Sequence, residues 1–546
     1  MERISCTLTL LIALLTSAGS AEWVSLKNGS ALPAAPKVTV LQDDGSTTVL
    51  KVDVHGFEVT TISSGGKLYQ SIDLLNDIIT DQAGHPAVPY IAEMIIIPDR
   101  GDATVQVIET GAIEKYNGFT LPPAKPSWEE GSPEPSFVEN DAAYRSASLY
   151  PGIMVTVGDP VVFRDFRIAR IAIYPVQFNA ATKELQVTTS ITIRVNYGGG
   201  TGTNARTSPR RAIPPSFGAV YRSSLINYES VLNRNFGGLE TGREVLLCIV
   251  PDTFATAFQP YVQWKHKTGT FVRFTKFSEI GATSSNPDII RNYIMQCYNN
   301  WTYPPTYVLL GGDYGYVPIK AATGQSFANE DYFVEIEGND VFPEAYIGRF
   351  THSTVSGLQT IINKVIKYER TPYRTNTDWF THAVVCANNA YPTQPETKRW
   401  VSNIMRESGG FTIDTLLNLY QGPCVYNVSN VITAINNGRS FLNYRGEGTS
   451  SGWTLANCYP FSTTNVSSVN NGEMLTFVTS IGCGVANFAV SGGNCFGEQW
   501  LELGTSTTPR GACAFVGPTW GNTHTKYNNA IDKGIYVALF QEGLHT

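Results

Sequence analysis

Apolar and polar positions follow one rhythm in the first part of the chain and another in the second. Within residues 22–197, short runs such as Lys37–Leu41 and Ser190–Val195 alternate apolar and polar β-forming residues, and Gly, Pro and Asn turns separate them. Strong β-formers at period two with frequent turn residues are typical of antiparallel sheets. The pattern predicts an all-β, sandwich-like domain over residues 22–197.

From residue 244 onwards, buried apolar runs alternate with amphipathic segments. Val245–Val250 and Tyr307–Leu310 have the composition of buried strands, and Val355–Tyr368 has one apolar face with helical spacing. Asp331–Glu335 is also expected to be strand-like. This alternation predicts a second domain, residues 244–546, with a mainly parallel α/β sheet and helices on both faces.

Residues 198–243 join the two predicted domains. Their first part, residues 198–215, is dense in glycine and proline, which indicates a flexible linker, and Arg210-Arg211 offers a basic cleavage point within it. Two interpretations remain open. The segment is either a plain tether between two permanent domains or the processing region between a pro-domain and a mature enzyme.

The N-terminus has the pattern of a secretory signal peptide. Within residues 1–21, Arg3 precedes the apolar run Leu8–Leu15, and small residues follow it. The run is too short to span a bilayer, and no later stretch is long and apolar enough to do so. We therefore expect a secreted protein whose mature chain has no membrane span. No closing strand is predicted after Ile535–Phe540, which leaves open whether the C-terminus is truncated.

Composition narrows the classes of protein that are compatible with the chain. Of its 546 residues 42% are hydrophobic and 16% charged, which describes a globular protein. The net charge of −7 provides no basic surface, so nucleic acid is not expected as a partner.

The nine cysteines do not predict a metal site. After Cys6, which leaves with the signal peptide, all lie at or beyond Cys248, and none are spaced as Cys-x-x-Cys. Some could form disulfides in an exported protein, for instance Cys424 with Cys458, although the sequence does not determine the pairing. No cofactor is expected, but one acidic turn is a hypothetical calcium site: Glu335, Glu337, Asn339 and Asp340.

The candidate chemistry lies where two predicted strands end. Phe441–Tyr444 is followed closely by Gly446-Glu447-Gly448, and Leu475–Ile481 by Gly482-Cys483-Gly484. As neighbouring parallel strands, these segments bring Glu447 and Cys483 to the same carboxyl edge of a sheet, where open sheets bind ligands. Small neighbours around a cysteine admit substrate and leave backbone N–H groups free. The pattern therefore favours a cysteine nucleophile.

A competing motif overlaps this region. Gly448-Thr-Ser-Ser-Gly452 satisfies Gly-x-Ser-x-Gly, the nucleophile motif of serine hydrolases. That motif needs a turn from strand to helix, whereas Trp453 and Asn457–Pro460 indicate a loop. A serine nucleophile is accordingly the weaker hypothesis.

From residue 244 to the end, the chain resembles the gingipain family of cysteine peptidases, which have a caspase-like fold. The region before the linker resembles the pro-domain that these enzymes carry behind a signal peptide. The segments that carry the resemblance are Tyr307–Asp313, Asn329–Phe333, Tyr346–Arg349, Ile366–Arg370, Asn443–Gly448 and Ser480–Cys483.

The resemblance implies roles for individual residues. Cys483 matches the family's nucleophile, while Glu447 occupies the position of its catalytic histidine. Backbone N–H groups at Gly448 and Cys483 are the expected oxyanion hole. Trp520 lies in a loop that in the family helps to wall the specificity pocket, and Asp331 matches an acidic position near the site.

Glu447 changes the expected chemistry. A carboxylate at ~4 Å would oppose thiolate formation by roughly 4 kcal/mol at an effective dielectric constant near 20. Glu447 therefore cannot take the histidine's role unless it is held protonated. His524, just past the strand that follows Cys483, is the candidate substitute imidazole.

Two functions follow from these observations. The first is a secreted cysteine endopeptidase, made as a proenzyme, that acts on protein or peptide substrates through a Cys483 acyl-enzyme and is bound by its own pro-domain. The alternative is an inactive pseudopeptidase that binds proteins, because Glu447 replaces the family's histidine.

Overall fold

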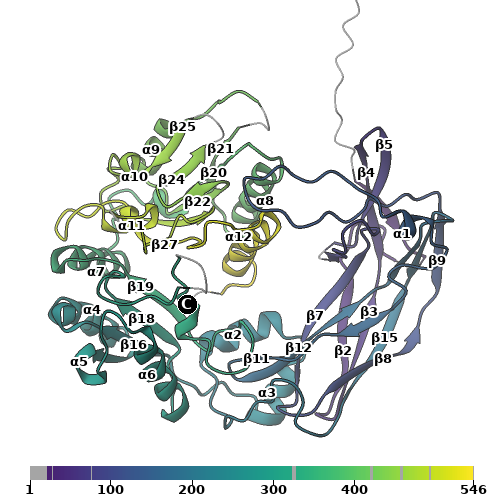
Figure 1. Cartoon of the computed structure of the whole chain (residues 1–546), viewed down its shortest axis with the longest axis horizontal. Helices are drawn as coiled ribbons and strands as arrows, with labels where there is room; N and C mark the ends of the chain where they lie inside the picture. Colours follow the sequence, from purple (N-terminus) through teal and green to yellow (C-terminus); the bar gives the residue numbers. More distant parts are fainter. Residues whose placement is uncertain are drawn as a thin grey trace, which may run out of the picture.

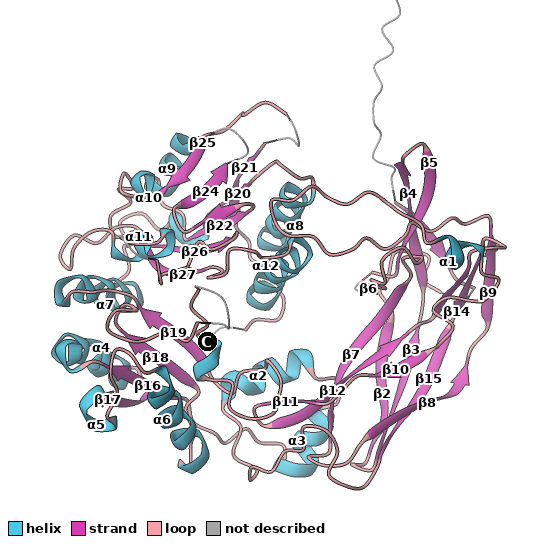
Figure 2. Ribbon diagram, viewed as in Figure 1, coloured by secondary structure: helices cyan, strands magenta, loops and turns pink. Residues whose placement is uncertain are grey.

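A computed structural model describes residues 21–544 except residues 28, 76, 322–326, 419–421, 456–458 and 491–492. The predicted signal peptide, apart from Ala21, lies outside the described residues. Figures 1 and 2 show an N-terminal β-domain beside a larger domain of strands and helices. No helix among the described residues has both the length and the apolar character needed to cross a membrane.

The N-terminal domain consists of antiparallel sheets. Their strand orders are β1-β4-β5, β10-β12-β7-β6 with β11 beside β12, β13-β14-β9 and β2-β3-β15-β8. The elements are β1 (Glu22–Ser25), β2 (Lys37–Asp43), β3 (Thr47–Asp53), β4 (Gly56–Ser64), β5 (Lys67–Asp73), β6 (Ile78–Ile79), β7 (Pro89–Ile97), β8 (Ala103–Thr110), β9 (Ile113–Asn117), α1 (Asp141–Arg145), β10 (Val155–Val157), β11 (Val161–Phe163), β12 (Phe166–Ile173), β13 (Val176–Asn179), β14 (Glu184–Thr188) and β15 (Ser190–Tyr197).

One hydrophobic core joins these sheets. Leu50, Ile95, Ile171 and Ile193 come from β3, β7, β12 and β15 and are fully buried in a common cluster. The period-two alternation places such residues on the inner faces. The predicted all-β architecture with antiparallel strands is confirmed.

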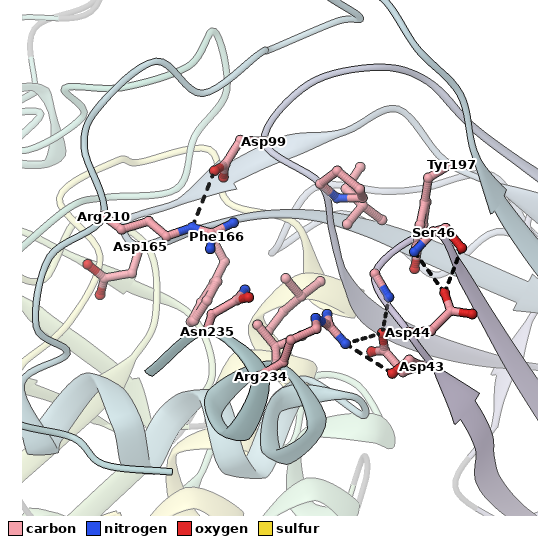
Figure 3. A pocket seen from close by; sticks show the side chains of 15 residues that line it. Asp43, Asp44, Ser46, Asp99, Asp165, Phe166, Tyr197, Arg210, Arg234 and Asn235 are labelled. Atoms are coloured by element: carbon pink, nitrogen blue, oxygen red, sulfur yellow. Dashed lines mark hydrogen bonds and ion pairs between the residues drawn. The ribbon is translucent and has the colours of Figure 1, made fainter. Parts of the chain in front are cut away.

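The segment expected to be a linker contains two helices, α2 (Pro215–Ser224) and α3 (Tyr228–Phe236). Both pack by buried aromatic and aliphatic residues against the β-domain. Figure 3 shows how ion pairs hold this region: Arg234 lies 2.8 Å from Asp43, and Arg210 lies 3.7 Å from Asp99. The four residues of these ion pairs line a recess of about 390 Å³.

The C-terminal domain contains two parallel sheets, with strand orders β17-β16-β18-β19 and β21-β20-β22-β26-β27. A small antiparallel sheet, β23-β24-β25, follows β22. The strands are β16 (Val245–Val250), β17 (Phe271–Lys276), β18 (Tyr307–Gly311), β19 (Tyr346–Phe350), β20 (His382–Ala387), β21 (Thr412–Leu417), β22 (Phe441–Arg445), β23 (Gly448–Thr449), β24 (Gly452–Leu455), β25 (Tyr459–Ser462), β26 (Thr476–Ile481) and β27 (Ala512–Val516).

Helices cover both faces of each parallel sheet, as Figure 2 shows. In the first sheet, α4 and α7 pack on one face and α5 and α6 on the other; in the second, α8 and α12 pack on one face and α9 and α11 on the other. The helices are η1 (Asp252–Phe254), α4 (Ala255–Lys267), α5 (Phe277–Ile280), α6 (Pro287–Asn300), η2 (Asp331–Phe333), α7 (Val355–Arg370), η3 (Asp378–Thr381), α8 (Thr393–Glu407), α9 (Val428–Asn436), α10 (Thr463–Val466), α11 (Phe496–Glu502) and α12 (Thr525–Phe540).

One local prediction differs from the structure, and the Gly-x-Ser-x-Gly motif lies in a hairpin. Asp331–Glu335, expected to be strand-like, begins with the short helix η2, because the N–H groups of Val334 and Glu335 both donate to the Asp331 carbonyl and close a turn. Gly448–Gly452 enters the hairpin of β23 and β24 and not a strand-to-helix turn, so it lacks the context that a serine nucleophile requires.

The acidic turn considered for calcium contacts the N-terminal part of the chain. Asp340 accepts a hydrogen bond of 2.8 Å from the Val162 N–H, and Glu337 accepts one from the Ser208 hydroxyl. Across the described residues, no group of three or more His, Cys, Asp or Glu side chains could hold a metal ion. The turn therefore connects the two domains through hydrogen bonds.

Most cysteines are buried free thiols: Cys248, Cys297, Cys386, Cys483 and Cys495 are buried, and Cys513 is partly buried. Cys424 is disulfide-bonded. Cys458, considered as its partner, lies outside the described residues.

Candidate active site

Cys483 and Glu447 follow adjacent parallel strands. β22 pairs with β26 in a register that places Arg445 opposite Ile481. Glu447 and Cys483, two residues further along each strand, therefore lie at the same edge of the sheet. Glycines make this approach possible, since a Cβ on Gly482 would lie only 2.6 Å from the Gly446 carbonyl oxygen. A Cβ on Gly448 would likewise lie 2.6 Å from Val485. The glycines on both sides thus allow two strand ends to meet.

The Cys483 thiol is buried and forms a hydrogen bond with Thr523. Its Sγ lies 3.1 Å from the Thr523 hydroxyl, and 6% of the residue is exposed. Burial raises the pKa of the thiol, the hydrogen bonds from Thr523 lower it, and the Glu130 carboxylate adds a smaller upward contribution. Because the pKa is raised, the neutral thiol predominates at pH 7.

Glu447 is half-buried in the turn after β22, at the same edge of the sheet as Cys483. Its carbonyl oxygen accepts hydrogen bonds from the Tyr444 hydroxyl at 2.6 Å and from the Thr454 N–H at 3.2 Å, which fix the turn after β22. Burial raises the pKa of the Glu447 carboxyl, and the Glu130 carboxylate raises it further. Both effects make the carboxylate a stronger proton acceptor than an exposed glutamate.

His524 is the residue that caps the N-terminus of α12, directly after Thr523. Its ring packs at 5.9 Å from the Tyr527 ring, and its buried Nδ1 has no hydrogen-bond partner within the described part of the chain. The hydrogen bond of Cys483 goes to the preceding residue, Thr523. His524 thus follows the residue that contacts the thiol, and among the described residues its imidazole makes no hydrogen bond to the sulfur.

Asp331 lines a different cavity, and Trp520 contacts one of the residues that line it. Asp331, Phe327 and Thr519 line a cavity of about 560 Å³, and Trp520 stacks on Phe327 with ring centroids 5.5 Å apart. The Trp520 carbonyl accepts a hydrogen bond of 2.8 Å from Gly484, which follows Cys483. The loop that holds Trp520 is thus bonded to the residue after Cys483, while the Trp520 ring packs on Phe327, which lines the Asp331 cavity.

A segment of the β-domain reaches this edge of the sheet. Figure 1 shows the loop after β9 extending across to α8 and α12. Within residues 128–131, the Glu130 N–H donates to the Thr523 carbonyl at 2.7 Å, and the Thr525 N–H donates to the Trp128 carbonyl at 3.3 Å. Glu129 and His524 form an antiparallel bridge. We call residues 128–131 the inserted segment.

Glu130 of the inserted segment forms a fully buried ion pair with Arg445. The Arg445 Nη2 lies 2.7 Å from the Glu130 Oε2, and neither side chain is exposed to solvent. Sequence reasoning missed Glu130, Arg445 and Thr523. One signal was present: Arg445 places a charge between the apolar run of β22 and Gly446, a position that requires a partner.

The parallel α/β sheet, the glycine-flanked cysteine at its carboxyl edge and the preceding β-domain define the class of cysteine peptidases with a caspase-like fold and a pro-domain. Residues 241–546 match Peptidase family C25, and residues 29–236 match Propeptide_C25. The chain therefore belongs to peptidase family C25.

Similar proteins include gingipains of Porphyromonas gingivalis. Gingipain R2 (strain W83) is 25% identical over 491 residues, which cover 89% of this chain and 65% of the relative. Lys-gingipain W83 is 24% identical over 493 residues, which cover 86% of this chain and 27% of the relative. The chain thus spans less than two thirds of these relatives.

The fold also resembles a solved structure. The crystal structure of the Arg-specific cysteine proteinase gingipain R matches with a TM-score of 0.50 and 24% identity. The match covers 56% of this chain and 68% of the other. This likeness concerns the fold.

The raised pKa of Cys483 predicts slow alkylation at neutral pH. Because the thiolate is the reactive form, the rate of iodoacetamide labelling of the full chain should rise about tenfold per pH unit below the thiol pKa. The pH at which the labelling rate reaches half of its maximum should lie above that of a cysteine in an unstructured peptide measured in the same buffer. Mass spectrometry of the Cys483 peptide gives the rate, with Cys483→Ser as control. A midpoint at or below the reference would contradict the predicted environment.

Proposed function

We propose that the protein is a secreted cysteine endopeptidase made as a proenzyme, with residues 22–197 as the pro-domain and Cys483 as the nucleophile. The observation that supports this proposal is the arrangement at the sheet edge, where glycines flank the thiol and the inserted segment binds the adjacent loop through an antiparallel bridge and backbone hydrogen bonds. An extended peptide bound through its backbone is the form in which peptidases hold substrates. Secretion is proposed from the signal pattern in residues 1–21.

The proposed step needs a proton carrier. Glu447 accepts the thiol proton as the Cys483 sulfur attacks the peptide carbonyl carbon, and a C–S bond forms. The protonated Glu447 then donates to the amine as the C–N bond breaks, and water later hydrolyses the thioester. The raised pKa of Glu447 supports this role, because it brings the carboxyl closer to the pH at which proton exchange is efficient.

The oxyanion that forms in this step requires donors. Backbone N–H groups at Gly448 and Cys483 are proposed for it, because Cys483 lies just after β26 and Gly448 begins β23 just after β22, at the same edge of the sheet. The name Lys-gingipain and the description of gingipain R as Arg-specific belong to those proteins, and we do not carry either preference over to this chain.

The rival function is a pseudopeptidase that binds proteins. The observation in its favour is that the Cys483 thiol is hydrogen-bonded to a threonine and its pKa is raised, whereas a nucleophile gains from a lowered pKa. The Glu447 carboxylate would add to this effect whenever it is ionised.

Activity should therefore depend on both Cys483 and Glu447. In a full chain carrying Glu130→Ala, which removes the buried ion pair of the inserted segment, a quenched peptide library should be cleaved. Cys483→Ala should abolish cleavage, and the isosteric Glu447→Gln should lower the rate at least 100-fold, the range of general acid–base catalysis. Glu129→Gln, at the exposed neighbour of Glu130, is the matched control and should retain the rate of its parent.

The variant Glu447→His distinguishes the pseudopeptidase from the endopeptidase. Absence of cleavage by the parent together with activity gained in Glu447→His would favour the pseudopeptidase, because the imidazole would then supply the missing base.

A further inference from the structure

The Glu130 side chain occupies a pocket that is built for a carboxylate. Arg445 donates to its Oε2 at 2.7 Å, Asn528 donates to the same oxygen at 3.2 Å, and Gln394 donates to its Oε1. These donors come from β22, α12 and α8, three separate elements around the edge of the sheet. Both carboxylate oxygens are therefore satisfied, and the occupant is fully removed from water. We call this site the Arg445 pocket.

Arg445 is held in place independently of Glu130. Its Nε donates to the Asn529 side chain at 2.7 Å, and its Nη2 also donates to the Thr525 carbonyl at 3.1 Å. The guanidinium is thus positioned before an occupant arrives. A neutral occupant would leave this buried charge without a counter-ion, and a basic one would add repulsion, so the pocket discriminates by charge.

The Arg445 pocket lies directly beside the proposed nucleophile. Thr523 connects them: its carbonyl accepts from the Glu130 N–H, and its hydroxyl lies 3.1 Å from the Cys483 Sγ. Asn528 also donates to the Thr523 hydroxyl at 2.8 Å. One residue of the loop therefore contacts both the occupant of the pocket and the sulfur.

The residue after Glu130 lies toward the proposed proton carrier. A Cβ on Gly131 would be 3.7 Å from the Glu447 Oε1, and the Gly131 carbonyl accepts from the Tyr391 hydroxyl at 2.8 Å. The inserted segment thus places one side chain in the Arg445 pocket and the following residue on the Glu447 side, with Cys483 near both. This is the order in which a substrate would present the residue before the scissile bond and the residue after it.

We infer that the Arg445 pocket is the specificity pocket for the residue before the scissile bond and that it selects an acidic side chain, glutamate above all. Glu130 is then an internal mimic of the substrate side chain. The inference rests on the proposed function, because only a peptidase has a scissile bond to position. The selection of a carboxylate by Arg445, Gln394 and Asn528 is a binding property that is measured without catalysis.

Protection of Cys483 from alkylation tests the inference in the full chain. With Glu130→Ala, short peptides that end in glutamate should slow iodoacetamide labelling of Cys483 at least fivefold at a concentration where otherwise identical peptides ending in glutamine or arginine have no effect. Arg445→Gln, added to Glu130→Ala, should remove this protection, and Arg445→Lys should keep part of it. Equal or better protection by the glutamine or arginine peptide would overturn the inference.

Two further variants keep the test independent of Glu130→Ala. Without added peptide, Glu130→Arg should label at least tenfold faster than wild type, and the charge exchange Glu130→Arg/Arg445→Glu should restore slow labelling. Glu129→Ala, next to Glu130 but exposed, is the matched control and should label as slowly as wild type. Fast labelling of the charge exchange together with slow labelling of Glu130→Arg would overturn charge selection.

The outcomes separate this inference from the proposed function. Selective protection by glutamate peptides without any cleavage of the quenched library would overturn the endopeptidase and support the pocket. Cysteine-dependent cleavage confined to bonds after arginine or lysine would support the endopeptidase and overturn the pocket's assignment.

Discussion

Replacing Arg164 by alanine is expected to lower the free energy of unfolding by about 3–5 kcal/mol, the range for breaking a buried ion pair by removing one partner. Arg164 lies between β11 and β12 and is almost fully buried, with its Nε 3.5 Å from the Asp165 carboxylate. It donates to the Pro305 carbonyl at 2.9 Å and to the Glu344 carbonyl, both in the C-terminal domain. The substitution removes a contact between the domains and leaves Asp165 buried.

Urea unfolding followed by tryptophan fluorescence measures this loss. Arg145→Ala is the matched control, because Arg145 forms an ion pair with Asp141 in which both side chains are at least 80% exposed, and its removal should cost less than about 0.5 kcal/mol. A loss below about 1 kcal/mol for Arg164→Ala would show that its interdomain contacts contribute little net stability.

Lys398→Met is expected to destabilise the C-terminal domain by a similar ~3–5 kcal/mol. Lys398 on α8 forms an ion pair with Asp532 on α12, and both side chains have no exposure. Asn443 on β22 joins them: it accepts from the Lys398 ammonium and donates to the Asp532 carboxylate at 2.9 Å. Methionine fills the volume but leaves the Asp532 charge without its counter-ion.

A second substitution should reverse much of this effect. Lys398→Met/Asp532→Leu replaces the pair by apolar side chains and should return the free energy of unfolding to within about 1 kcal/mol of wild type. Arg399→Met is the control, because Arg399 is the exposed neighbour on the same helix. If the double variant were as unstable as Lys398→Met, the loss would come from the methionine and not from the unpaired aspartate.

The sequence predicted those parts of the fold that depend on local pattern. The alternation in residues 22–197 reports which faces of the strands are buried, and the structure has antiparallel strands there. The strand ends at Glu447 and Cys483 could be placed together, since neighbouring parallel strands end at one edge. Periodicity does not specify which strands pair, so the division of the parallel strands between two sheets was not predicted.

The missing part of the candidate site depends on contacts that are remote in sequence. Glu130 and Arg445 are 315 residues apart, and nothing in the composition around Glu130 distinguishes it from its exposed neighbour Glu129. Residue type alone did not single out Thr523, because a neutral threonine hydroxyl suits proton transfer less well than the imidazole of the adjacent His524. Turn closure at Asp331 depends on backbone hydrogen bonds that the β-forming residues after it do not reveal.

The covalent connection between the two domains sets the effective concentration of Glu130 at the Arg445 pocket. While residues 198–215 join the β-domain to the C-terminal domain, Glu130 is an intramolecular ligand, and its effective concentration at the Arg445 pocket is set by the connecting chain and independent of dilution. A cut in residues 198–215 would turn the same contact into a bimolecular one. Occupancy of the pocket would then fall as the protein is diluted, so the concentration of the cleaved protein would itself determine how long the site stays covered.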